Sequence, residues 1–315
     1  MERKDFVYDT KKSGFGARVK KDFVRNWPIY AILSPVVIYF IIFSYIPMVG
    51  LSMAFQNYNI HRGFWNSDWV GFQHFIDFFN SHHFNRILRN TFLISLYDLL
   101  LNFPAPIIFA LLLNELRSIK FKRVVQTISY MPFFISMVVI AGLIMDFFSS
   151  SGPMTQLISF FGGPSGNLMG NNDTWRAIFV GTALWQGIGF ASIIYVAALA
   201  GIDQEQYEAA RMDGAHRLRQ IWHITLPGLR PTITILLIMR LGQLLNVGFE
   251  RVILLYSPAV FETADVINSF VYRRGLIETD FSFATAVGFF NSVVSLVLVI
   301  SANYIARKVG ETSLF

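Results

Sequence analysis

Polar and charged side chains recur at helical spacing inside segments that are otherwise apolar. Successive members of each set are three or four residues apart, which places them on one face of a helix. The sets are Thr91, Ser95, Asp98 and Asn102; Thr182, Gln186 and Gly189; and Arg240, Gln243, Asn246 and Glu250. A charged side chain inside a bilayer costs about 2.5–3.5 kcal/mol even on insertion scales, so these groups should face protein or water. The three faces therefore predict helices that surround a common polar interior.

The composition indicates that the elements carrying these sets are membrane helices. Of the 315 residues, 54% are hydrophobic and only 15% are charged, whereas soluble domains average about 25% charged residues. Windows of about 20 apolar residues have the length that crosses a bilayer. Six such windows fall near residues 27–55, 91–113, 128–148, 177–200, 232–247 and 283–305. We expect an all-α polytopic membrane protein with six transmembrane helices.

Basic residues predict the orientation of these helices. The segment 1–27 is rich in Lys and Arg, and no small-residue cleavage site follows it, so it is interpreted as a retained cytoplasmic tail. With both termini inside, the inner segments hold most of the Lys and Arg, as cytoplasmic loops do. The expected domains are the basic tail 1–27, the six-helix domain 28–306 and a cytoplasmic tail 307–315. The net charge of +6 then requires no nucleic acid as a partner.

Motifs for autonomous chemistry are missing from the sequence. It contains no Cys, which excludes disulfides and thiolate metal sites. It also lacks the G-x-x-x-x-G-K-[ST] phosphate loop, the H-E-x-x-H zinc motif and G-x-S-x-G. His82-His83 is an isolated pair with no third ligand evident. We assign no catalytic residue, no metal ligand and no cofactor to this chain, so motive power must come from another subunit.

The predicted inner loop 201–230 is the most informative segment. Asp203 is a suitable N-cap for a helix over 204–212, which Gly214 ends. A second helix is expected over 215–225, ending before Pro227. One interpretation of such a basic loop is an amphipathic helix that lies on the lipid headgroups.

A more specific interpretation comes from residue identities in this loop. Glu208-Ala209-Ala210, Gly214 and Ile224-x-Leu226-Pro227 resemble the EAA motif of the permease subunits of binding-protein-dependent ABC importers. The resemblance implies a coupling helix that docks into a cleft of a cytoplasmic ATPase. The coupling residues it implies are Glu208, Ala209, Ala210, Asp213, Gly214, Ile224, Leu226 and Pro227.

The resemblance extends over most of the chain and looks strongest to the carbohydrate-uptake branch, the oligosaccharide and polysaccharide permeases similar to maltose permease. The stretches that carry it are 29–50, 226–251, 265–275 and 311–315. It implies a bacterial inner-membrane location, a second homologous permease, an extracytoplasmic solute-binding protein and an oligosaccharide substrate. Two ATP-binding subunits, docked on the EAA loop, would bind ATP and Mg. In this family the helix after the coupling loop lines the substrate route.

Two interpretations remain open for the polar interior. In the first, its side chains contact sugar hydroxyls in transit, which need paired donors and acceptors. These pathway residues are Asp98, Asn102, Gln186, Arg240, Gln243, Asn246 and Glu250. In the second, Asp98 and Arg240 form an interhelical ion pair that fixes packing, since intramembrane charges usually pair. Arg240 favours an acidic sugar unless Asp98 neutralises it.

Two other classes of protein remain as alternatives. One is an ion-coupled secondary transporter of a polar solute, with the ion near Asp98 and the second span broken at Pro104 and Pro106. The other is a membrane enzyme or a sensor that uses the same loop to signal to a kinase.

Overall fold

The computed structural model describes residues 15–308 and divides the chain into two compact units, residues 1–52 and 53–315. The resembling stretch 311–315 and most of the predicted tail 307–315 lie outside the described residues, as do residues 1–14. Each unit is described by itself.

The first unit is a long interrupted helix. α1 (Phe15–Phe40) contains Pro28 and Pro35 and is kinked at Asn26, because proline removes a helical hydrogen bond and clashes with the preceding turn. It continues through a π-helical turn, Ile41–Tyr45, and α2 (Ile46–Met48) into a 3₁₀ turn, Val49–Phe55. The apolar span Asp22–Phe55 begins slightly before the predicted limit. The helix itself begins at Phe15, inside the predicted tail 1–27.

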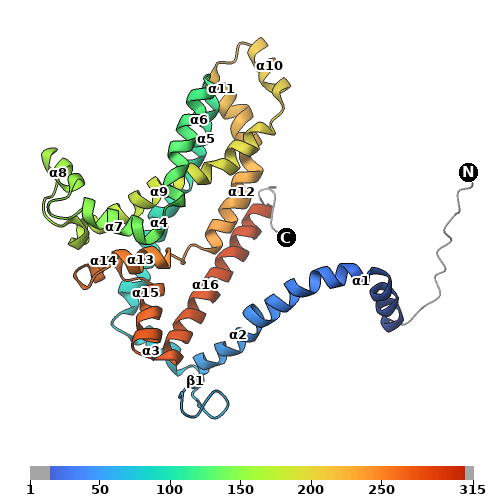
Figure 1. The fold of residues 1–315 in the computed structure, drawn as a ribbon, viewed down its shortest axis with the longest axis vertical. Helices are drawn as coiled ribbons and strands as arrows, with labels where there is room; N and C mark the ends of the chain where they lie inside the picture. Colours follow the sequence, from blue (N-terminus) through green and yellow to red (C-terminus); the bar gives the residue numbers. More distant parts are fainter. Residues whose placement is uncertain (1–14, 309–315) are drawn as a thin grey trace, which may run out of the picture. The chain divides into compact units, whose positions relative to one another are not determined.

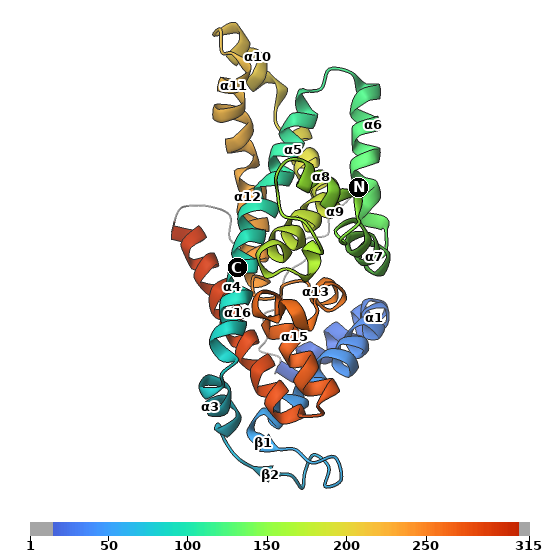
Figure 2. The same cartoon turned by 90° about the vertical axis from the view of Figure 1, so that its left-hand side faces the viewer.

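The second unit is built almost entirely from helices (Figure 1). A two-stranded antiparallel ribbon pairs β1 (Gln56–Asn57) with β2 (Asp68–Trp69). The helices are α3 (Gln73–Asn80), α4 (Phe84–Asn102), α5 (Pro104–Glu115), α6 (Ile119–Tyr130), α7 (Met137–Phe147), α8 (Pro153–Phe160), α9 (Asn172–Ala200), α10 (Gln204–Met212), α11 (Arg217–Gln220), α12 (Leu226–Gly242), α13 (Phe249–Leu255), α14 (Phe261–Ala264), α15 (Ile267–Tyr272) and α16 (Phe281–Lys308). Figures 1 and 2 place α10 and α11 at one end of this unit and α3 with the strands at the other.

Five segments of the described chain are long and apolar enough to cross a membrane, and a bent pair of helices raises the number to six. The five are Asp22–Phe55, Phe84–Glu115, Asn172–Ala200, Arg217–Gly242 and Phe281–Lys308. The prediction of an all-α protein with several membrane helices is therefore confirmed, with spans that begin earlier than the apolar windows suggested.

The third predicted span, 128–148, is not one straight helix. Ile119–Phe134 and Met137–Phe147 meet at an angle of 99°. Pro132 lies in the 3₁₀ turn Met131–Phe134, and Ser136 caps the next helix by accepting from the Val139 amide. The hydropathy of the sequence does not reveal the turn at Pro132 or the cap at Ser136, because both are compatible with a high mean hydropathy.

α9 is the central helix of the second unit. It packs against α4, α5, α6 and α12. Its first half contributes Trp175 and Phe179 to an apolar cluster with α7, α13 and α14, while Tyr195 and Leu199 pack against α5 and α12. The helix therefore connects both ends of the unit and positions the side chains that it presents in the middle.

A buried ionic cluster fixes α14 and α15 against α4. Asp265 is fully buried and accepts from Arg86 at 3.1 Å and from Arg273 at 2.8 Å. Burial alone lowers the pKa of Arg273, but the hydrogen bonds and charge of Asp265 outweigh it and raise the net pKa. Asn90 donates to the Asp265 carbonyl at 3.1 Å. This half of the unit is thus held by polar contacts as well as apolar packing.

Candidate functional site

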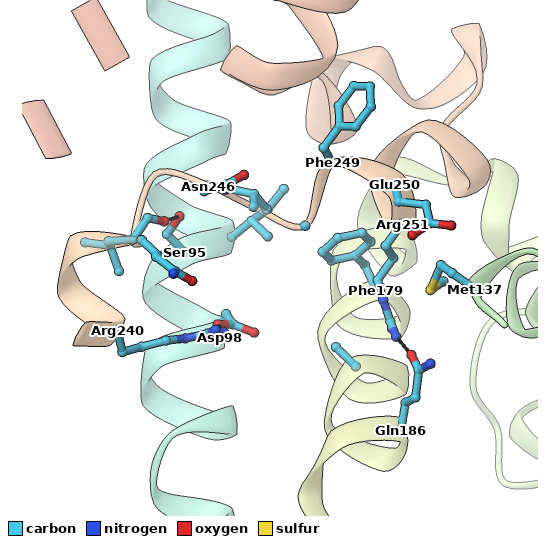
Figure 3. Close-up of a pocket in the computed structure, with 16 residues that line it drawn as sticks. Ser95, Asp98, Met137, Phe179, Gln186, Arg240, Asn246, Phe249, Glu250 and Arg251 are labelled. Carbon is cyan, nitrogen blue, oxygen red and sulfur yellow. Dashed lines mark hydrogen bonds and ion pairs between the residues drawn. The ribbon is translucent and has the colours of Figure 1, made fainter. Parts of the chain in front are cut away.

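A cavity of about 690 Å³ lies where α4, α9 and the segment after α12 meet. Its lining combines apolar side chains with polar and charged ones (Figure 3). The polar members are Ser95, Asp98, Gln186, Arg240, Gln243, Asn246, Glu250 and Arg251. Members of the polar sets of three separate segments thus line one cavity in the structure.

Asp98 and Arg240 form an ion pair across two helices. The Arg240 Nη2 donates to Asp98 Oδ2, and Asn102 donates to Asp98 Oδ1 at 2.7 Å. The Asp98 side chain is 25% exposed and the Arg240 side chain is 43% exposed. The pair therefore borders open space. The interhelical ion pair, one of the two open interpretations, is present in the structure.

A second cavity of about 330 Å³ lies on the other side of this pair. Both cavities are lined by Asp98, Ala183 and Arg240. The second one extends along α5 and the later part of α9, where Pro106 and Tyr195 line it, whereas the first extends toward α13. Asn102 lines the second cavity only. The ion pair is therefore part of the wall between two spaces.

The predicted helical face of the fifth span is wrong. α12 ends at Gly242, with Gln243 as its C-cap, and Gly248 adopts a left-handed conformation with φ 56°. A new helix, α13, begins at Phe249. Gln243, Asn246 and Glu250 nevertheless line the same cavity as Arg240, because the non-helical turn folds them toward it. A left-handed residue at 248 favours glycine, which has no Cβ to clash.

Hydrogen bonds fix this turn on both sides. Ser95 donates from Oγ to the Leu244 carbonyl. Asn268 of α15 donates to Asn246 Oδ1 at 2.7 Å. The turn is thus a defined wall of the cavity.

Arg251 is the functional candidate that sequence reasoning missed. Its Nη1 donates to Thr182 Oγ1 at 3.2 Å, and its Nη2 donates to Gln186 Oε1. Its guanidinium carbon lies 6.0 Å from the centre of the Phe179 ring. Burial lowers the pKa of Arg251 to about 10, with the Asp98 charge acting in the opposite direction, so the side chain is a cation at neutral pH. In Figure 3, Arg251 and Gln186 lie on the side opposite Asp98 and Arg240.

Two members of the predicted polar faces have other roles. Thr91 is fully buried, and its hydroxyl accepts from the Ile267 amide at 3.0 Å, which links α4 to α15. Gly189 packs against the backbone of α6, where an added Cβ would lie 2.2 Å from the Ser129 carbonyl oxygen. These two positions therefore serve helix packing, and they do not line the large cavity.

The EAA segment is an exposed helix at the end of the unit. α10 has the predicted bounds, and Asp203 caps it by accepting from the Glu205 amide at 3.0 Å. Gly214 adopts φ 74° after its end, as a helix-terminating glycine does. Glu208, Ala209 and Asp213 are exposed, and Ala210 is half-buried. The loop is placed by a hydrogen bond of 3.0 Å between the hydroxyls of Tyr207 and Thr225.

The second helix of this loop differs from the prediction. Instead of ending before Pro227, the chain runs from α11 through a π-helical turn, Ile221–Thr225, directly into α12. Pro227 follows this π-helical turn, at the start of α12. Ile224 and Leu226 are half-buried, and Pro227 is exposed. The segment from α11 to α12 is thus continuous up to Gly242, and a turn at Gly214 joins it to α10.

A bundle of apolar spans around a polar cavity, with an exposed helix joined to one span, defines a polytopic membrane transport subunit. Residues 102–311 match the family described as binding-protein-dependent transport system inner membrane component, and the chain belongs to this family. It is therefore a permease subunit of an ABC importer, a multi-pass inner-membrane transport protein and not an enzyme, and a binding protein is among its partners.

Named relatives cover almost the whole chain. Protein LplB of Bacillus subtilis (strain 168) is 44% identical over 300 residues, which cover 95% of this chain and 93% of that protein. The polygalacturonan/rhamnogalacturonan transport system permease protein YteP of the same organism is 42% identical over 288 residues, covering 91% and 90%.

Two solved structures are similar over nearly the full length. One is a bacterial ABC transporter involved in the import of the acidic polysaccharide alginate, with a TM-score of 0.86 and 44% identity over 92% of this chain and 99% of that chain. The other is a bacterial alginate ABC transporter in complex with an alginate pentasaccharide-bound periplasmic protein, with a TM-score of 0.87 and 43% identity over 94% and 100%.

Proposed function

We propose that this permease pairs with a second, homologous permease and that the two enclose the pathway for an oligosaccharide in a bacterial cell membrane. Both termini are cytoplasmic in this proposal. Two ATPase subunits dock on α10 and bind ATP and Mg, and an extracytoplasmic binding protein delivers the sugar at the opposite face. ATP-driven closure of the ATPases moves α10 and turns the cavity alternately outward and inward.

The observation that carries the proposal is the exposed α10, which a short turn joins to the continuous segment Arg217–Gly242 that reaches the cavity. Glu208 and Ala209 are exposed. Three large apolar residues are exposed as well, by 88% for Met212, 73% for Leu218 and 70% for Trp222. Leu218 and Trp222 belong to the apolar segment Arg217–Gly242, whereas Met212 lies on α10 itself, where an exposed apolar group beside an acid suits a protein surface. In this proposal, a displacement of α10 reaches Arg240 through the Tyr207–Thr225 contact and the continuous segment Arg217–Gly242.

The lining of the cavity supports a saccharide as the substrate. Sugar hydroxyls both donate and accept, and Ser95, Gln243 and Asn246 offer both kinds of group beside the cavity. The proposed pathway residues remain Asp98, Asn102, Gln186, Arg240, Gln243, Asn246 and Glu250, with Arg251 added. The relatives named for polysaccharide transport favour the same class.

Crosslinking tests the docking of α10 directly. The chain contains no cysteine, so Ala209→Cys introduces a unique thiol on α10. In membranes that contain the complete transporter, we expect this thiol to crosslink to a single cysteine in the cleft of the ATPase, and the yield to change when ATP is added.

A matched variant controls for proximity to the membrane surface. Asn66→Cys places the thiol on the exposed loop between β1 and β2, at the other end of the unit (Figure 1), and should give no ATPase crosslink. If Ala209→Cys reacts only with lipid-borne probes while import continues, α10 is no docking helix. Uptake that survives ATP depletion but collapses with an ion gradient would identify a secondary transporter instead.

A further inference from the structure

The two cations of the large cavity have different partners. Arg240 pairs with Asp98, whose opposite charge neutralises it. Arg251 is held by the Thr182 hydroxyl and the Gln186 amide oxygen, which are both neutral. Within the described residues, Arg251 forms no ion pair with a carboxylate. Arg251 is therefore the cation of this lining that has no carboxylate of the described chain in hydrogen-bond contact, although the Asp98 charge also acts on it.

We infer that Arg251 recognises a carboxylate of the transported saccharide, so that the substrate class is an acidic oligosaccharide. The inference rests on the proposed function and assigns the substrate class to the same cavity. It assigns the acid preference to Arg251, whereas the sequence alone associated it with Arg240.

The geometry of Arg251 suits this role. A guanidinium carries five N–H donors in a planar fork, of which Thr182 and Gln186 engage two. Those two contacts and the Phe179 ring hold the plane of the fork, so less rotamer entropy is lost when a ligand binds. The remaining donors can bind a carboxylate in the bidentate geometry that makes arginine selective for it.

The other acid of the cavity does not occupy this position. Glu250 lines the cavity beside Arg251 but is exposed, and in the described structure it forms no ion pair with that arginine. Glu250 is thus solvated, and a substrate carboxylate would not have to displace it. Two of the relatives also carry acidic polymers in their names or descriptions, alginate and polygalacturonan.

Ligand binding to the purified complex of both permeases and the two ATPases, without the binding protein, tests the inference free of the selectivity of the binding protein. The two probes are a trigalacturonate and the same trisaccharide with its carboxyl groups reduced to alcohols, titrated calorimetrically. We expect the wild type to bind trigalacturonate at least about tenfold more tightly than the reduced trisaccharide. A charge-assisted hydrogen bond contributes a free energy that corresponds to this fold-change. Arg251→Gln should remove this preference by weakening acid binding while the affinity for the neutral sugar stays the same.

Two further variants make the result specific. Arg251→Lys keeps the charge but lacks the fork, so it should retain only part of the preference, and it serves as the test if the glutamine variant does not assemble. Arg62→Gln removes an exposed arginine that pairs with Asp68 far from the cavity lining, and its preference should equal that of the wild type.

Distinct outcomes overturn the inference and the proposed function. A wild type that binds and imports neutral sugars without preferring acids refutes the role of Arg251 but leaves the saccharide permease intact. The role of Arg251 is also refuted if an assembled Arg251→Gln transporter loses affinity for both probes equally. It is refuted as well if the Arg251→Lys variant keeps the full preference for the acidic probe. Failure of the wild type to bind or import any saccharide refutes the proposed function itself.

Discussion

At the level of single residues, one carboxylate is shared by two partners at the boundary between two cavities. Asp98 accepts from Arg240 through one oxygen and from Asn102 through the other. Because intramembrane charges are costly without a partner, removing either charge leaves the other exposed to a poorly solvating environment. The pair therefore couples α4 to α12 at the point where the cavities are divided.

Exchanging the two charges tests this coupling. Asp98→Arg or Arg240→Asp alone brings like charges together, and we expect uptake and thermal stability of the complex to fall. The double exchange should restore both, with a coupling free energy of about 1–3 kcal/mol in a double-mutant cycle. Radiolabelled uptake and the melting temperature of the purified complex provide the measurements. If the double variant assembles normally yet stays inactive, the pair is needed for contact with the substrate and not for packing.

At the level of elements, apolar windows predicted where the spans lie but not where they break. Hydropathy is insensitive to the π-helical turn Ile221–Thr225 and to the left-handed Gly248, since neither changes the apolar character of the segment. The short helix over 204–212 was predicted to the residue because its cap, Asp203, and its stop, Gly214, are local signals.

The candidate site was predictable in part for the same reason. Asp98, Gln186 and Arg240 lie on helices where the periodicity holds, and they line the cavity as expected. Arg251 follows Glu250 by one residue, so in a continuous helix it points about 100° away from the predicted face. Only the turn after Gly242 brings it to the cavity, and no local sequence signal specifies the direction of that turn.

The close approach of α9 to α6 gives a prediction for an element. Gly189→Ala should prevent this packing, because the added Cβ would lie 2.2 Å from the Ser129 carbonyl oxygen. Small residues let membrane helices approach closely. We expect the amount of folded transporter to fall several-fold and its melting temperature to drop.

The matched control lies two residues away on the same helix. An added Cβ at Gly187 meets nothing within 4 Å, so Gly187→Ala should leave the melting temperature near that of the wild type. Equal effects of the two substitutions would show that glycine at 189 is not required for close packing.

At the level of the whole molecule, the irregular wall of the cavity indicates that this side of the unit faces water or protein and not lipid. The backbone between α12 and α13 is not helical, and Arg240 keeps 43% of its side chain exposed. In a bilayer, non-helical backbone is tolerated only where protein covers it or water fills the space beside it. The open side of this unit therefore requires cover other than lipid.

Production of the chain without its partners tests this requirement. We expect the permease made alone to be degraded or aggregated, with a yield several-fold below that obtained when the second permease is co-expressed. Size-exclusion chromatography of a fluorescent fusion measures both amount and dispersity. A lone chain that is monodisperse and melts at the same temperature as the assembled transporter would contradict the proposed pairing.

The neutrality of the Asp98–Arg240 pair has a consequence for the energetics of the membrane. A lone charge that crosses the field gains or loses about 2.3 kcal/mol per 100 mV. A guanidinium and a carboxylate that move together carry no net charge, so the membrane voltage does no work on them. As long as α4 and α12 move together in the transport cycle, this ion pair adds no voltage dependence to its rate.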